Sequence, residues 1–477
     1  MNRPTPPPGP GTVPSIPAQR PATENATTTF APVDGPTVPL VPATGPPPPA
    51  PAPRTAPPQE RTGRLLGVDA ARGLALFGII AVHALLEAGD DGAPTTSYLI
   101  FGGRSAALFA VLAGVSLAFV TGRAQVRAGP DLRAAAATLA TRAGILLLLA
   151  FALSWTDPSI ATLILPYYAV AFVLAIPLVA LPTRVLAPLA VLFCLGIPVL
   201  SQLVRPLLPR TDPGHPSPVD LVADPLGLLS GLTVTGAYPA VIWLAYMAVG
   251  LVVGRLRLSS VRTAVSLLAG GTAAALAATG ISMWLLGPGG GYAAIVAASP
   301  PALLESAPTV AAAVTGTPDG VTPTTTWWWL ATAAPHSGTP LDVVATTGAA
   351  LAALGATLLL AGITRPGVSR VLGHVLRPVA AAGAMTLTFY VASVLFMNSP
   401  LDTFDPVEGY LWQIAVAAAI GLAWRRGVGR GPLEALVSAP AHALRDRARA
   451  RARAAGRDRV SPAHEAAPPV AVGGRRT

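Results

Sequence analysis

The sequence is poor in charged side chains and in aromatic residues. Charged residues make up 11% of its 477 positions and aromatic residues 6%, whereas hydrophobic residues make up 52%. A soluble globular protein carries about a quarter charged residues, so this composition excludes an ordinary soluble domain. Most of the chain is therefore expected to face lipid.

Lysine is absent, and cysteine occurs once. The 32 basic residues are all arginine and exceed the 22 acidic ones, which gives a formal net charge of +10. Because the arginines lie between apolar runs and in the C-terminal tail, they indicate membrane topology and not nucleic-acid binding. The single Cys194 excludes a disulfide framework and a cysteine-based zinc cluster. No histidine and carboxylate group shows metal-ligand spacing, so no metal is expected.

The first 60 residues contain 20 of the 52 prolines and few large apolar residues. Such a segment buries too little surface to offset the entropy of ordering, which predicts a disordered Pro-rich extension. No apolar run follows directly on a charged start, so a signal peptide is not expected. The sequence predicts three regions: the extension at 1–60, a transmembrane domain at 61–435 and a basic cytoplasmic tail at 436–477 that is attracted to anionic lipid.

From Leu65 onward, apolar stretches of about 20 residues recur, the length that crosses roughly 30 Å of hydrocarbon. Arginines follow every second stretch, which places both termini in the cytoplasm; Arg205 and Arg210 depart from this pattern. The arginine-only, Ala-, Gly- and Pro-rich composition indicates a GC-rich bacterial genome and hence a bacterial plasma membrane. The predicted fold is an all-α bundle of about ten transmembrane helices, at residues 65–86, 98–120, 136–154, 160–181, 185–204, 237–256, 261–286, 341–363, 371–397 and 407–425.

The first predicted helix carries a polar stripe. With about 3.6 residues per turn, Asp69, Arg72, His83 and Glu87 fall on one face. A charge near the bilayer centre costs roughly 2.5 to 3.5 kcal/mol, so this face is expected to point into the bundle, with Asp69 and Arg72 able to form an ion pair. His83 lies near the opposite interface, where an imidazole can accept a proton near neutral pH. The alternative is a histidine that is only hydrogen-bonded there.

Arg104 stands at the start of the second span, against the basic-inside pattern. It is expected either to pair with a nearby carboxylate, Glu87, Asp90 or Asp91, or to bind an anionic or carbonyl group of a substrate. On the same side, the segment Pro335-His336-Ser337-Gly338 ends a long loop at 287–340. Two histidines on one membrane face predict a shared site. The remaining histidines are expected to face solvent: His215, His374, His442 and His464.

Aromatic side chains gather near the predicted outer boundary. They are interpreted as an interfacial belt, with a sugar-binding or lid role as the alternative for the three adjacent tryptophans, since their loop is long enough to cover a pocket. The set comprises Tyr167, Tyr168, Tyr238, Trp243, Tyr246 and Trp327 to Trp329.

Several segments together resemble a known group. Arg64-x4-Asp69-x2-Arg72-Gly73, an apolar run to His83, and Gly103-Arg104-Ser105 followed by Ala-Ala-Leu-Phe-Ala-Val-Leu-Ala-Gly-Val-Ser116 are similar to the opening of the bacterial relatives of heparan-alpha-glucosaminide N-acetyltransferase. They are also similar to the YeiB-like membrane proteins of the same transmembrane acyltransferase group. Gly236-Ala-Tyr-Pro-x3-Trp243-x2-Tyr246, the Pro-His-Ser-Gly turn and Met385-Thr-Leu-Thr-Phe-Tyr390 extend the resemblance over residues 64–435.

The resemblance implies acetyl or other acyl transfer from acyl-CoA, bound from the cytoplasm, to a sugar acceptor on the other side. The lysosomal branch carries its proposed catalytic histidine between helices 1 and 2; here residues 88–97 hold none, and His83 just before them is the positional substitute. Imidazole can act as base or nucleophile in such a transfer. The predicted catalytic residues are His83, oriented by Glu87 or Asp90, and His336 as a second acid or base.

Further residues are assigned to binding. Arg104 is expected to hold the acceptor, in the company of Tyr98, Ser105, Ser337 and Trp243. Arg123, Arg127 and Arg255 on the cytoplasmic side meet CoA phosphates or are ordinary topology charges.

A transporter or lipid-handling protein without acyl transfer is the competing hypothesis. In that case the polar stripe would form a proton or substrate path, and Pro166, Pro177 and Pro198 would break helices 4 and 5 as in many carriers. Gly250-x3-Gly254 permits close helix packing, within the chain or between chains. The expected partners are membrane lipids and a glycan acceptor, with no nucleic acid.

Overall fold

The computed structural model describes residues 66–89, 93–209, 214–304, 309–316, 320–440 and 443. All described residues belong to one compact unit, residues 63–477. Within the described ranges the chain is helical without a strand, and the one isolated bridge joins Ala88 to Pro94. The predicted all-α membrane fold is confirmed. The Pro-rich extension, Arg61, Arg64, Asp90, Asp91, Arg210, His442, His464 and most of the basic tail lie outside the described residues.

Seven helical segments are long and apolar enough to cross a membrane, which makes the chain a multi-pass membrane protein. α2 and α3 together form one of them, and the 3-10 turn η1 (Arg205–Leu207) extends another. The set is α1 (Leu66–Ala84), α2 (Thr96–Phe101) with α3 (Arg104–Val120), α4 (Pro130–Ala152), α7 (Thr183–Val204), α11 (Val261–Leu286), α14 (Pro340–Ala361) and α17 (Pro406–Gly427).

Two further spans are bent. α9 (Pro225–Ser230) with the π-helical turn η2 (Gly231–Thr235) meets α10 (Ala240–Gly254) at 45°, and α15 (Pro366–Gly383) meets α16 (Thr386–Met397) at 78°. α5 (Leu165–Leu174) is shorter, and α6 (Ile176–Val179) follows it. The count is therefore seven, or nine with the bent pairs, among the described residues; the predicted number of about ten is not confirmed.

A short helix at residues 432–440 contacts the start of α16, where the sharper bend lies. The carboxylate of Glu434 accepts hydrogen bonds from Leu387 N at 2.7 Å, Thr388 N at 3.2 Å and Thr388 Oγ1 at 2.6 Å. These backbone groups belong to the first turn of α16, where amide hydrogens lack partners inside the helix. Glu434 thus caps α16 as a separate helix at an angle to α15.

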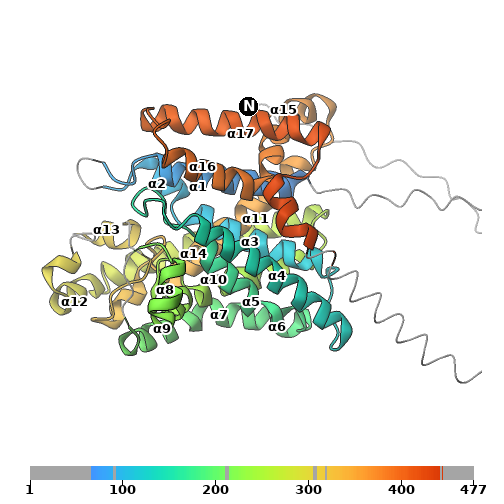
Figure 1. Cartoon of the computed structure of the whole chain (residues 1–477). Helices are drawn as coiled ribbons and strands as arrows, with labels where there is room; N and C mark the ends of the chain where they lie inside the picture. The colour runs from blue at the N-terminus through green and yellow to red at the C-terminus, as the bar shows by residue number, and fades with distance from the viewer. Residues whose placement is uncertain are drawn as a thin grey trace, which may run out of the picture. The chain divides into compact units, whose positions relative to one another are not determined.

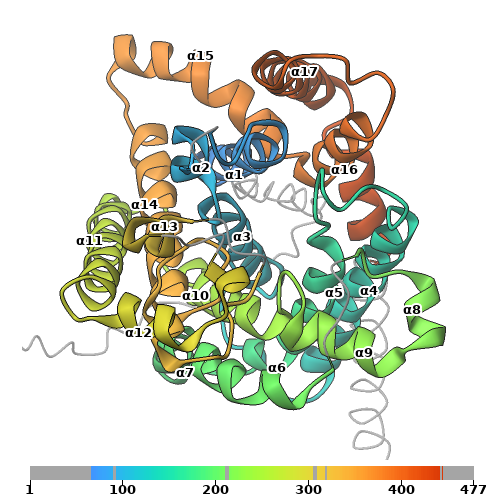
Figure 2. The same cartoon turned by 90° about the vertical axis from the view of Figure 1, so that its left-hand side faces the viewer.

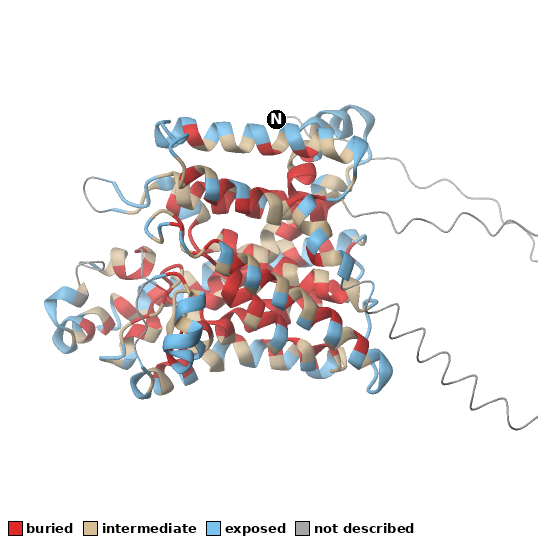
Figure 3. Cartoon of the chain, in the orientation of Figure 1, coloured by how far each residue is buried: buried red, intermediate tan, exposed pale blue. Residues whose placement is uncertain are grey.

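α1 and α3 lie at the centre of the bundle, where α3, α14, α15, α16 and α17 pack against α1 (Figures 1 and 3). Small residues allow close contact between α3 and α10: a Cβ on Gly250 would lie 1.9 Å from Val111 O, and one on Gly254 would lie 2.6 Å from the Ala118 Cβ. The Gly250-x3-Gly254 pattern therefore packs inside the chain.

Peripheral helices show apolar side chains on their outer surface. Leu192 on α7 is 61% exposed, Leu276 on α11 is 70% exposed and Leu411 on α17 is 53% exposed. Helices that span a membrane satisfy their backbone internally and present such side chains to lipid. The buried residues in Figure 3 accordingly concentrate inside the bundle, and the exposed ones follow the outer helices and the loop elements.

The long loop between α11 and α14 is folded. It contains α12 (Gly291–Ala298), η3 (Pro301–Leu304), α13 (Val310–Thr315) and η4 (Trp327–Ala331), and its apolar cluster includes Leu286, Ile295 and Trp329. Figure 2 shows α12 and α13 beside the ends of α11 and α14, and the two-turn unit of α8 (Pro218–Ala223) and α9 on another side of the bundle. The loop meets the end of α1 that carries His83, through residues described below.

Candidate functional site

Two adjoining cavities lie at the His83 end of α1. The histidine cavity has a volume of about 20 Å³ and is lined by His83, Ser105, Thr162 and Tyr390, among others. The aromatic cavity also has about 20 Å³ and is lined by Trp243, Tyr246, Gly320 and Asp342, among others. Their common wall consists of Gly103, Tyr238 and His336.

His83 and His336 come from parts of the chain more than 250 residues apart, and both line the histidine cavity. His83 is the penultimate residue of α1 and is partly buried. Near the other end of the same helix, Asp69 is 2% exposed. The polar face of α1 therefore points into the bundle, and the expected convergence of the two histidines is present.

His336 is held by a close backbone contact. The amide of Gly103 donates to His336 Nε2 at 3.2 Å, and the His336 ring meets the Tyr238 ring edge-on with centroids 5.4 Å apart. A Cβ on Gly103 would lie 2.7 Å from the Pro335 Cβ, and both Gly103 and His336 adopt positive φ, 61° and 63°. A side chain at position 103 would thus meet both strain and a clash. Burial lowers the pKa of His336 to about 4, so the ring is neutral near pH 7.

Asp342 is a site residue that the sequence analysis missed. It lies in the first turn of α14 and is 2% exposed. Its backbone amide donates to Thr339 Oγ1 at 3.1 Å, and its Oδ2 accepts from Gly338 N at 3.0 Å. The Thr-x-x-Asp spacing at a helix start is the signal that could have found it, although that pattern by itself indicates only a cap.

Residues 64–286, which run from just before α1 to the end of α11, match the family model described as heparan-alpha-glucosaminide N-acetyltransferase, catalytic. This segment is similar to the catalytic domain of heparan-alpha-glucosaminide N-acetyltransferase. The match supports the membrane acetyltransferase group that the resemblance implied. No curated protein matches the chain. His83, Tyr238 and Trp243 lie inside the acetyltransferase match, whereas His336 and Asp342 lie beyond it.

The aromatic residues of the matched segment do not form the predicted interfacial belt. Tyr168, Trp243 and Tyr246 are buried, 3%, 6% and 4% exposed, and their rings pack on one another with Tyr168 to Trp243 centroids at 5.8 Å and Trp243 to Tyr246 centroids at 5.2 Å. Hydropathy does not tell which face of a helix an aromatic residue occupies, so the belt interpretation was wrong for them. Tyr238 stacks edge-on against Trp243 at 5.5 Å.

The three adjacent tryptophans lie in the long loop, away from both cavities. Trp329 is buried in the apolar cluster of the loop, Trp327 is 55% exposed, and Trp328 contacts α12 at Gly291. None of them lines either cavity. The long loop contributes to the site through Gly320 and His336 instead.

The other predicted residues divide into those at the cavities and those beside them. Ser105 and Trp243 line a cavity. Arg104 donates to Leu99 O at 2.6 Å and lines neither cavity, although its neighbours Gly103 and Ser105 do. Tyr98 and Ser337 are buried nearby, and Ser337 Oγ donates to Thr339 Oγ1 at 3.3 Å. Glu87 is exposed beyond the end of α1.

The arginines expected to meet CoA phosphates lie at the other end of α3 and α10. Arg255 donates to Leu181 O at 2.8 Å and to Val179 O at 3.1 Å, which ties the end of α10 to the turn between α6 and α7. Arg123 donates to Leu256 O, and its guanidinium lies 5.4 Å from the Phe119 ring centroid. Arg127 is exposed.

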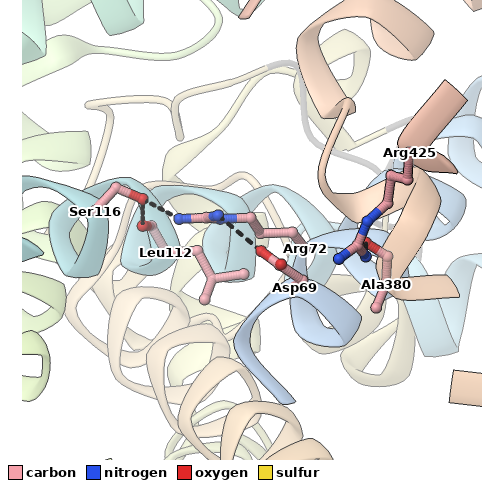
Figure 4. Close-up of polar contacts among 6 residues, drawn as sticks. All are labelled: Asp69, Arg72, Leu112, Ser116, Ala380 and Arg425. Atoms are coloured by element: carbon pink, nitrogen blue, oxygen red, sulfur yellow. Dashed lines mark hydrogen bonds and ion pairs between the residues drawn. The ribbon is translucent and has the colours of Figure 1, made fainter. Parts of the chain in front are cut away.

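At the opposite end of α1 from His83, polar groups pair with one another (Figure 4). Arg72 Nη1 lies 3.1 Å from Asp69 Oδ1, and Arg72 Nη2 donates to Ser116 Oγ on α3 at 2.5 Å. Ser116 in turn donates to Leu112 O at 2.7 Å. The predicted ion pair is thus present and links α1 to α3.

Two remaining expectations concern metal and histidine. Among the described residues there is no group of three or more histidine, cysteine or acidic side chains that could hold a metal ion.

Of the other histidines, His374 is exposed as expected. His215 is 8% exposed and its Nδ1 accepts from Leu163 N at 3.5 Å, so its predicted solvent role was wrong. Packing of the 214–217 segment against the turn before α5 accounts for the difference.

Proposed function

We propose that the chain transfers an acetyl group from acetyl-CoA, bound at the Asp69 end of the bundle, to a glycan acceptor at the His83 end. The observation that supports this proposal best is that two imidazoles, His83 and His336, line one cavity, and most of its other lining residues lie within the segment that matches the acetyltransferase model. Imidazole is suited to receive the acceptor's proton during acyl transfer. The arginine pattern supports a bacterial plasma membrane with the Asp69 end and both termini cytoplasmic.

The proposed reaction proceeds at the histidine cavity. The hydroxyl or amino group of the acceptor attacks the thioester carbonyl carbon, its proton passes to His83, the carbon–sulfur bond breaks, and CoA leaves as the thiol after taking up that proton. Alternatively His83 itself first takes the acetyl group and passes it to the acceptor, as an activated nucleophile does. Ser105 and Tyr390 line the same cavity and are placed to contact the reacting groups.

The test uses inverted membrane vesicles that contain the full chain and are loaded with glucosamine. Acetyl-CoA labelled in the acetyl group is added outside, where the cytoplasmic face is exposed. We expect labelled N-acetylglucosamine to accumulate inside, and His83→Ala to slow the transfer by about 10²- to 10⁴-fold, the usual contribution of a general base. His374→Ala, an exposed histidine on α15, is the matched control and should transfer at the wild-type rate.

A carrier function is the second candidate, because the spans α9–α10 and α15–α16 are bent by 45° and 78°. Broken helices near a substrate site are common in secondary transporters. The same vesicles separate the two functions. Passage of unmodified glucosamine without labelled product supports the carrier, and undiminished labelling by His83→Ala contradicts the assignment of His83.

A further inference from the structure

The first half of α15 carries three exposed valines. Val368, Val371 and Val375 are 46%, 67% and 61% exposed. With about 3.6 residues per turn, their spacing of three and four residues places them on one face of the helix. A contiguous exposed apolar face marks a surface that interacts with something outside the chain.

The other faces of this half-helix have different surroundings. Leu376 is 8% exposed and packs with Ala70 of α1 in a small apolar cluster, so its face meets the bundle. Arg370 and Arg377 are exposed and lie seven residues apart, which places them on a third face away from the valines, with His374 beside them. No acidic residue occurs in α15. The half-helix therefore has a bundle face, an apolar face and a cationic face.

α15 lies across the direction of the spans. It meets α16 at 78°. In Figure 2 α11 and α17 are seen end-on, whereas α15 is seen along its length. Its last residue is fixed beside the first turn of α1, since a Cβ on Gly383 would lie 1.9 Å from Asp69 O. When the spans cross a bilayer, α15 therefore runs along the membrane surface at the Asp69 end of α1.

We infer that residues 366–377 form an interfacial helix that binds anionic phospholipid. The three valines enter the boundary between headgroups and acyl chains, and Arg370 and Arg377 bind the lipid phosphates. An amphipathic helix with arginines on its polar face lies in the membrane interface in this way. The apolar stem of an arginine can follow the helix surface while its guanidinium reaches a phosphate and pairs with two of its oxygens. The inference does not depend on acetyl transfer.

The test uses the full chain in phosphatidylcholine nanodiscs. Val371→Cys, in a Cys194→Ala background, carries an environment-sensitive fluorophore on the apolar face. Phosphatidylglycerol or phosphatidylcholine with a doxyl quencher on its acyl chain is added at equal mole fraction. We expect both lipids to quench the fluorophore, and phosphatidylglycerol to quench it more strongly, because its net negative charge draws it to the arginines.

The double variant Arg370→Gln/Arg377→Gln measures the contribution of the cationic face. Each arginine near an anionic membrane surface contributes about 1 kcal/mol, so removing both should lower the association constant of phosphatidylglycerol relative to phosphatidylcholine by about 10- to 30-fold. Quenching by phosphatidylcholine should not change. All four substituted side chains, including those of the control below, are exposed, and the melting temperature of each variant checks that it is folded.

Arg133→Gln/Arg184→Gln is the matched control. It removes the same charge from two exposed arginines in the first turns of α4 and α7, and it should keep the wild-type preference within about twofold. A fluorophore that neither lipid quenches would show that protein, such as a second copy of the chain, covers the valines. Equal quenching by the two lipids in the wild type, or an equal loss of preference in the control, would remove the anionic selection. Each of these results overturns the inference.

Discussion

The two ends of α1 use polar residues in opposite ways. At one end Asp69 pairs with Arg72, and Arg72 reaches Ser116, so the charges meet partners within the protein. At the other end His83, His336 and Asp342 line cavities, and Asp342 Oδ1 is left without a partner among the described residues. A buried polar stripe therefore does not by itself mark a site, because the Asp69 end of this one is paired within the protein.

The largest change in stability is expected at the paired end. Arg72→Ala removes the guanidinium that lies 3.1 Å from the buried Asp69 carboxylate and donates to Ser116; breaking such a buried pair destabilises by about 3 to 5 kcal/mol. Denaturation of the purified chain in detergent measures it. The double variant Asp69→Ala/Arg72→Ala should be less destabilised than the sum of the single variants. Strict additivity would show that the two residues do not act as a pair and would remove the contrast between the ends.

An intermediate effect is expected from Gly103→Ala at the cavity end. The positive φ of Gly103 and its contact with Pro335 predict a loss of about 1 to 3 kcal/mol, together with displacement of His336. The rate of acetyl transfer should fall more in Gly103→Ala than in the control Gly122→Ala. Gly122 also has a positive φ, 84°, but no atom lies within 4 Å of a Cβ added there. Equal transfer rates for the two variants would show that His336 need not be held.

The smallest effect concerns pH. The pKa of His336 is lowered from 6.5 to about 4, so the folded protein favours the neutral ring. The contribution of the neutral ring to the free energy of unfolding is fully present above pH 6.5. It is lost as the pH falls toward 4, because His336 takes up a proton at higher pH in the unfolded chain than in the folded protein. Between pH 7.5 and 5.5 the wild type should lose about 1 kcal/mol more stability than His336→Gln. If the stability of the wild type and of His336→Gln changed equally with pH, the His336 ring would be solvated in the folded protein.

The sequence predicted the helical membrane architecture and the inward face of α1, because charge and apolar length are local properties. It did not predict the number of spans: residues 160–181, expected to form one span, contain α5 of 10 residues and α6 of 4 residues instead. It also placed Trp243 and Tyr246 at the lipid interface although they line a cavity.

Asp342 was not predicted as a site residue, because helix capping alone explains a Thr-x-x-Asp spacing. Only the three-dimensional arrangement shows that Oδ2 accepts from Gly338 N, that Oδ1 has no partner among the described residues, and that Asp342 lines the aromatic cavity. In contrast, the meeting of His83 and His336 was expected from their common membrane side. Roles in catalysis and binding for His83, Glu87, Arg104 and the cytoplasmic arginines stay predictions.

The amide of Gly103 also fixes the tautomer of His336. Since that N–H points at Nε2 of His336, the lone pair there is occupied and the neutral ring carries its hydrogen on Nδ1. His336 in this tautomer is a donor toward its surroundings and would have to release Gly103 before it could become a base. In the proposed transfer His336 is therefore a hydrogen-bond donor, and the proton acceptor is His83.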